Sequence, residues 1–126
     1  MPKWNIVRLE LARTAEFPEG SASRAYILRV PLAAAGLIDE EALTKRPAMA
    51  TVRRFWPNER DQSGYLIRNG KGWAFSYAIG DDDDEKISPL EAHPLRLGDY
   101  VTITEQDGAS LPFRVARSHP DGVARL

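Results

Sequence analysis

The chain has 126 residues, of which 43% are hydrophobic and 28% are charged, and it contains no cysteine. This length and composition are typical of one globular domain with an ordinary core. The lack of cysteine excludes disulfides and thiolate-based metal sites, and two histidines are too few for a multi-histidine site. We therefore expect no cofactor and no metal centre.

The formal net charge of −1 is unevenly distributed, because residues 45–77 carry +5 and residues 78–110 carry −7. No apolar run approaches the ~18 residues that a membrane-spanning helix needs. The N-terminal segment carries charges where a secretory signal needs an apolar core. We expect a cytoplasmic protein without membrane contact, whose opposite charges steer it towards a partner.

The first third of the chain predicts two strands separated by a loop. Within Trp4–Arg13, Val7, Leu9 and Leu11 alternate with Ile6, Arg8 and Glu10, which is the side-chain period of a half-buried strand. Arg24–Val30 has the same period, with Tyr26, Leu28 and Val30 on one face. Thr14–Ser23 holds proline, glycine and serine and predicts the loop.

The segment Leu32–Pro47 breaks the β pattern and predicts short helical structure. Leu32–Gly36 suits a single turn closed by glycine. Asp39–Arg46 has acids first and bases last, which complements a helix dipole, and Pro47 ends it. This segment is too short for a second domain, so we expect an insert over one end of a barrel.

The middle of the chain predicts three more strands. Met49–Trp56 is the first, and Gly64–Gly80 is a hairpin around Asn69-Gly70, a strong turn signal. Trp73, Phe75, Tyr77 and Ile79 alternate with smaller residues and form one apolar face. The same face could line a ligand cavity, but small barrels are more often filled by their own side chains.

The segment Gly80–Pro94 is predicted to be a long solvated loop, because it holds two prolines and a block of acids. The acidic block consists of Asp81, Asp82, Asp83, Asp84 and Glu85. Carboxylate oxygens are ligands for hard cations and attract basic partners, so the block is a candidate binding segment. However, it lacks the spacing of a calcium-binding loop.

The last hairpin has two strands, Tyr100–Glu105 and Leu111–Arg117, and its register can be predicted. A three-residue loop, Gln106 to Gly108 with glycine at a positive φ, pairs Ile103 with Leu111 and Val101 with Phe113. That pairing puts the apolar residues on one face, whereas a slip by one residue would separate them. Tyr100, Thr102, Thr104 and Arg114 then form a polar outer face.

These elements predict a mainly β, single-domain, small antiparallel barrel of about seven strands with one short helical insert. A partly open barrel with a Greek-key return is our first arrangement, and a sandwich is the alternative. We expect residues 1–119 to form the barrel and residues 120–126 to form a flexible tail with Pro120 and Gly122.

A mixture of basic and aromatic residues lies between positions 53 and 73. The candidates for nucleic-acid or partner binding are Arg53, Arg54, Trp56, Arg68 and Lys71. Proteins that bind single-stranded nucleic acid hold its phosphates with basic side chains and stack its nucleobases on aromatic rings. Against this, adjacent arginines on a strand point to opposite faces, and the chain as a whole is not basic.

Catalysis has little support in the sequence. His93 and Glu91 are close in a proline-rich loop, but no nucleophile motif accompanies them. We interpret the chain as a non-catalytic binding or interaction module with a protein partner. The remaining hypotheses are a single-stranded nucleic-acid binder that uses the 53–73 region and a small-ligand-binding barrel.

Overall fold

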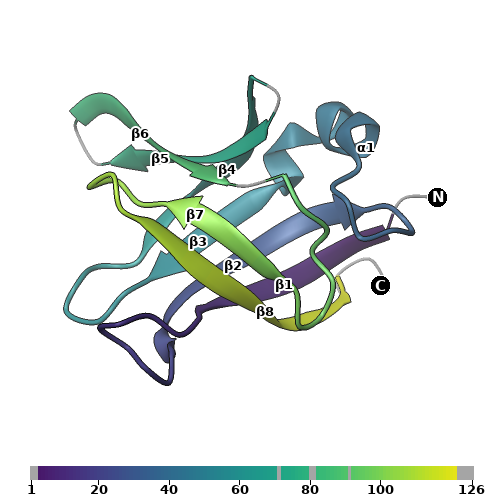
Figure 1. Cartoon of the computed structure of the whole chain (residues 1–126). Helices are drawn as coiled ribbons and strands as arrows, with labels where there is room; N and C mark the ends of the chain where they lie inside the picture. The colour runs from purple at the N-terminus through teal and green to yellow at the C-terminus, as the bar shows by residue number, and fades with distance from the viewer. Residues whose placement is uncertain (1–2, 71, 80–81, 91, 122–126) are drawn as a thin grey trace.

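The described residues of the computed structural model, 3–70, 72–79, 82–90 and 92–121, form eight strands that close into an antiparallel barrel (Figure 1). The strands are β1 (Lys3–Leu11), β2 (Ser21–Leu32), β3 (Thr51–Phe55), β4 (Gln62–Asn69), β5 (Gly72–Ile79), β6 (Asp82–Leu90), β7 (Tyr100–Thr104) and β8 (Ser110–Pro120). The predicted fold class, a small antiparallel barrel, is confirmed.

The order of the strands differs from the predicted Greek key. Each strand pairs with its neighbours in sequence, and β1 pairs with β8, so the sheet is an up-and-down barrel that closes on itself. Among the described residues, β6 pairs with β7 at one position, Leu90 with Ile103, so most of the edge between these two strands has no described ladder pairing. The register of β1 against β8 shifts between Arg8 and Leu9, where an irregularity bends the ladder.

The eighth strand comes from the segment predicted to be a loop. β6 pairs with β5 from Leu90 opposite Trp73 to Asp82 opposite Ile79. The prediction of a loop was wrong for Asp82–Leu90, because these residues form a strand that pairs along β5 and covers its edge. The acidic residues Asp82–Glu85 form the first part of β6.

The predicted register of the last hairpin is confirmed. β7 and β8 pair Val101 with Phe113 and Ile103 with Leu111. Gly108 has a φ of +89° and donates its amide to the carbonyl of Glu105, as the three-residue loop requires. Consequently Val101, Ile103, Phe113 and Val115 are buried in the core, and Leu111 packs against it partly buried.

The interior is filled by side chains of the barrel strands. Tyr26 contacts Phe75 and Phe113, with ring centroids 5.1 Å and 5.2 Å away. Two short helices, α1 (Glu40–Lys45) and η1 (Pro47–Met49), lie where β2 ends and β3 begins (Figure 1). Asp39 caps α1 by accepting from the Ala42 amide, and Leu43 packs into the core.

The last described residues belong to the barrel. β8 continues beyond residue 119, since Pro120 pairs with Asn5 of β1. Asp121 is buried, and its carboxylate lies 3.1 Å from Nε of Arg29. Among the described residues, none of the helices is both long enough and apolar enough to cross a bilayer.

Candidate functional site

Two groups of polar and charged residues lie on either side of the β1–β2 loop, residues 12–20. One group, the barrel-end cluster, consists of Tyr26, Arg54, Glu59 and Glu105 and closes the barrel from inside. The other, the arginine cleft, is an outward-facing cleft that contains Arg13 and Arg114. The backbone around Leu11 contributes to the walls of both.

The barrel-end cluster is an extended hydrogen-bonded network. Nε and Nη2 of Arg54 donate to one carboxylate oxygen of Glu105, at 3.2 Å and 2.9 Å. The Tyr26 hydroxyl donates to the other oxygen. Nη1 of Arg54 donates to Glu59 at 2.9 Å, and the guanidinium lies 4.1 Å from the ring centroid of Trp56. Every polar group of Arg54 and Glu105 therefore has a nearby partner.

Burial and charge shift the titration of this cluster. Burial lowers the pKa of Arg54, but its hydrogen bonds to Glu105 and Glu59 more than compensate and raise it further above its ordinary range. Burial raises the pKa of Tyr26, and the neighbouring Tyr77 and Glu105 add to the rise. The pKa of Tyr77 is also raised, by burial and then by Glu105. The arginine stays charged and both phenols stay neutral.

The Tyr77 hydroxyl differs from that of Tyr26. It is fully buried and interacts electrostatically with Tyr26, yet it has no hydrogen bond of good geometry to a described residue.

Above the cluster is an open cleft of about 420 Å³, bordered by Phe17, Arg24 and Trp56. Because Arg24 lies over the Phe17 ring, at 4.1 Å from its centroid, these side chains largely contact one another. We interpret the cluster as a structural closure of the barrel.

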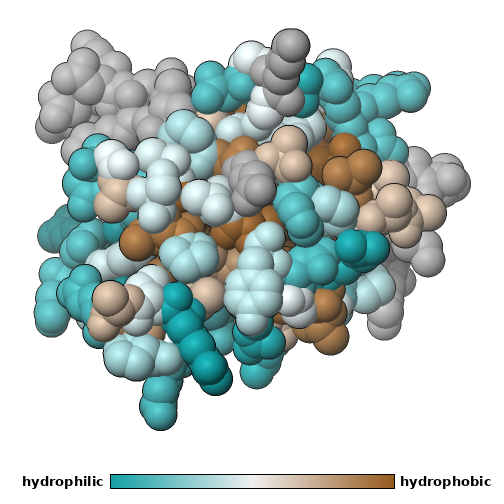
Figure 2. Space-filling model, in the orientation of Figure 1, coloured by the Kyte–Doolittle hydropathy of each residue, from teal (hydrophilic) through white to brown (hydrophobic). Residues whose placement is uncertain are grey.

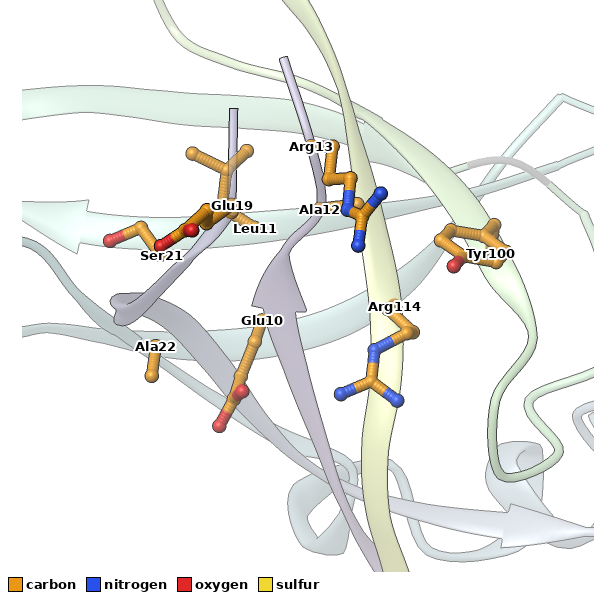
Figure 3. Close-up of a pocket in the computed structure, with 10 residues that line it drawn as sticks. Glu10, Leu11, Ala12, Arg13, Glu19, Ser21, Ala22, Tyr100 and Arg114 are labelled. Carbon is orange, nitrogen blue, oxygen red and sulfur yellow. The ribbon is translucent and has the colours of Figure 1, made fainter. Parts of the chain in front are cut away.

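The arginine cleft is open to solvent and has a volume of about 490 Å³. Figure 3 shows Arg13 and Arg114 with their guanidinium groups in the cleft, Glu19 and Ser21 across from them, and Tyr100 beside them. Arg114 lies on β8 opposite both Glu10 of β1 and Tyr100 of β7. Figure 2 shows hydrophilic side chains on this face of the molecule, with hydrophobic ones exposed between them near the centre of the view.

The two arginines of the cleft have no carboxylate partner among the described residues. Glu10, the nearest acid in the ladder, is occupied, because its carboxylate accepts from Nε of Arg8 at 2.7 Å. Glu19 is the remaining acid of the cleft and is exposed. By contrast, a carboxylate within 4 Å neutralises each of Arg8, Arg29, Arg53, Arg54, Arg68 and Arg96.

The β1–β2 loop that forms one wall of the cleft is firmly held. The Phe17 carbonyl accepts from the amides of Thr14 and Gly20, both at 2.9 Å, and the Ala12 amide donates to Pro112 at 2.9 Å. Gly20 has a φ of +74°, and a Cβ there would lie 2.6 Å from the Leu11 carbonyl oxygen. The wall is therefore fixed before any ligand arrives, which lowers the entropy cost of binding.

The structure separates the basic residues predicted between positions 53 and 73. Arg53 is exposed and lies 3.6 Å from Asp61, whereas Arg54 points into the barrel and Trp56 packs against it. Arg68 is near the opposite end of β4, 3.4 Å from Glu40 of α1, and Lys71 lies outside the described residues. Arg54 and Arg68 are therefore at opposite barrel ends and do not form a common surface.

The other predicted candidates are only partly described. Asp81 and Glu91 lie outside the described residues, and for Asp82–Glu85 the backbone alone is described, as part of β6. His93 lies with Nδ1 2.8 Å from the carbonyl of Pro94. No cluster of three or more His, Asp or Glu side chains suited to a metal ion occurs among the described residues.

Comparisons with known proteins give no further assignment. No protein-family model matches the chain, no curated protein matches it in sequence, and no solved structure matches it at a significant level. The function is therefore inferred from the residues of the barrel-end cluster and the arginine cleft.

The sequence predicted the outer position of Arg114 and Tyr100 but not the cleft. Arg13 was assigned only to the end of the first strand, and Glu105 only to the end of another. The signal for Arg114 was its place in the alternation of β8. No local signal marks Glu105 as a partner of Arg54, because 51 positions separate them.

Proposed function

We propose that this chain is a binding module that takes an anionic ligand in the arginine cleft. The observation that carries the proposal is that Arg13 and Arg114, neither with a carboxylate partner among the described residues, line the same open cleft. Guanidinium groups bind phosphate and carboxylate through paired N–H donors, which favours an anionic group between them.

The chemistry of the cleft supports binding more than catalysis. The cleft brings together no nucleophile with an adjacent base, and its two acids are exposed or paired with arginine. Its volume of about 490 Å³ lies within the range of small-molecule sites. A filled barrel interior leaves the outer surface as the better place for a ligand.

The test is titration of the protein with inorganic phosphate, followed by NMR of backbone amides. We expect shifts concentrated at residues 10–13, 19–22 and 114. Arg13→Ala and Arg114→Ala should each weaken binding by about ten-fold or more, since each removes a charge-assisted hydrogen bond worth about 1.5–3 kcal/mol. Glu19→Gln should strengthen binding, because it removes the opposing charge.

Arg60→Ala is the matched control, since Arg60 is an exposed arginine outside the cleft. It should bind phosphate as the unaltered protein does. Shifts scattered over all exposed arginines, or an Arg13→Ala Arg114→Ala double variant with unchanged affinity, would show that phosphate only screens surface charge and would refute the proposal.

A further inference from the structure

We infer that the ligand of the arginine cleft is a nucleotide, with its phosphate on Arg13 and Arg114 and its base on the ring of Tyr100. This inference rests on the proposed anion-binding function and names the chemical class of the ligand. It depends on one further residue, Tyr100, and on how that residue is placed relative to the arginines.

Tyr100 is an exposed aromatic ring beside the two cations. It is 59% exposed and lines the cleft from β7, directly opposite Arg114 in the β7–β8 ladder. Side chains directly opposite each other across an antiparallel pair begin about 5 Å apart at Cβ. The ring is therefore within reach of a group that is joined to an anion held by Arg114.

The ring is also free to stack. Neither another aromatic ring nor a guanidinium packs on Tyr100 among the described residues, whereas arginines cover Phe17, Phe55, Trp56 and Trp73. Nucleobases stack on such exposed rings with about 1–3 kcal/mol per base. A cleft with two cations and one uncovered ring therefore offers the two contacts that a nucleotide needs.

The row of unpaired arginines continues along β8. Arg117 is exposed, has no carboxylate partner among the described residues and lies opposite Arg8 of β1. The register shift between Arg8 and Leu9 lets Arg114 and Arg117, three positions apart, both be exposed. Arg117 is about 10 Å from Arg114 along the strand, at about 3.3 Å per residue. The nucleotide is either free or one unit of a single-stranded chain whose next phosphate meets Arg117.

The first experiment compares 5′-AMP, ribose 5-phosphate and inorganic phosphate by NMR titration. We expect 5′-AMP to bind at least five-fold more tightly than ribose 5-phosphate, because the base adds about 1 kcal/mol or more of stacking. Tyr100→Ala should remove this advantage and leave ribose 5-phosphate binding unchanged. Tyr65→Ala is the matched control, since Tyr65 is 50% exposed on β4 and lies outside the cleft.

The outcomes separate the two proposals. Equal affinities for 5′-AMP and ribose 5-phosphate, both lost in the arginine variants, would overturn the nucleotide inference and keep anion binding. If none of the three compounds shifts the cleft amides, anion binding fails, and the nucleotide inference fails with it. An equal loss of 5′-AMP affinity in Tyr65→Ala and Tyr100→Ala would also overturn the role of Tyr100.

The second experiment tests whether the ligand is a free nucleotide or part of a single-stranded chain. It measures fluorescence anisotropy with a labelled oligo(dA) of eight nucleotides. Tighter binding than that of 5′-AMP, a steep loss between ~50 and ~200 mM salt, and weakening by Arg117→Ala would assign a single-stranded chain. Oligonucleotide binding no tighter than that of 5′-AMP, with Arg117→Ala neutral, would assign a free mononucleotide. No binding of either ligand would overturn the inference.

Discussion

The barrel-end cluster and the arginine cleft lie at the same end of the barrel, but their arginines differ in burial and in pairing. Arg54 is buried, hydrogen-bonded to two carboxylates and covered by an indole ring. Arg13 and Arg114 are exposed and without a carboxylate partner among the described residues. A few residues of the β1–β2 loop separate the two environments.

This difference distinguishes a structural charge from a charge available to a ligand. A buried guanidinium must be paired, because leaving it unpaired in the core costs several kcal/mol. An exposed guanidinium is hydrated, so it can exchange water for a ligand anion at little cost. The number of arginines at this end of the barrel does not indicate a binding site. What indicates one is whether each arginine has a carboxylate partner.

The largest expected effect is that of Glu105→Ala on stability. The substitution leaves Arg54 charged and Tyr26 without an acceptor inside the barrel, so the free energy of unfolding should fall by about 3–5 kcal/mol. Urea unfolding followed by tryptophan fluorescence measures it. Glu59→Ala, at the exposed side of the same arginine, should cost less than about 1 kcal/mol. Equal losses for both variants would mean that Glu105 is not the structural partner.

The second effect is loss of stability in alkali. The folded-state pKa values of Tyr26 and Tyr77 are raised, so the unfolded chain loses these protons first as the pH rises above about 10. Stability is fully present below that pH and should fall by about 1.4 kcal/mol per pH unit for each phenol above it. Urea unfolding from pH 8 to 11 measures this slope. A Tyr26→Phe Tyr77→Phe variant with the same slope would contradict the assignment.

The third prediction separates the two buried tyrosines. Tyr26→Phe should lower the free energy of unfolding by about 1.5–3 kcal/mol, because it removes a hydrogen bond to a buried carboxylate. Tyr77→Phe should not lower it and should raise it by up to about 1–3 kcal/mol, since that hydroxyl is buried without a hydrogen bond of good geometry and its lost hydration is not compensated. Thermal unfolding of the two variants side by side gives the comparison, and the reverse order would refute it.

The smallest expected effect on stability is in the arginine cleft. Arg13→Ala and Arg114→Ala should each change the free energy of unfolding by less than about 0.5 kcal/mol, because neither removes an ion pair of the described structure. The same two variants should lose phosphate binding. A stability loss above about 1 kcal/mol with binding retained would place these arginines with Arg54, as structural charges.

Much of the fold was predictable because it depends on local patterns. The alternation in β1 and β2 identified Leu9, Tyr26 and Leu28 as core, and all three are fully buried. The positive-φ glycine at position 108 fixed the register of the β7–β8 hairpin. β6 was missed because its acids and its proline resemble a loop, and only its pairing along β5 makes it a strand.

The amino-acid sequence by itself determined the class of fold, most of the strands and which face of each strand is buried, since a period of two acts between neighbouring residues. Tertiary structure alone decided which charges are paired. Tyr26 and Glu105 are 79 positions apart, and Arg54 meets Glu105 across the barrel end. Arg13 and Arg114 share a cleft only because the first strand closes on the last. The pairing of charges depends on closure of the sheet, so no local sequence pattern predicts it.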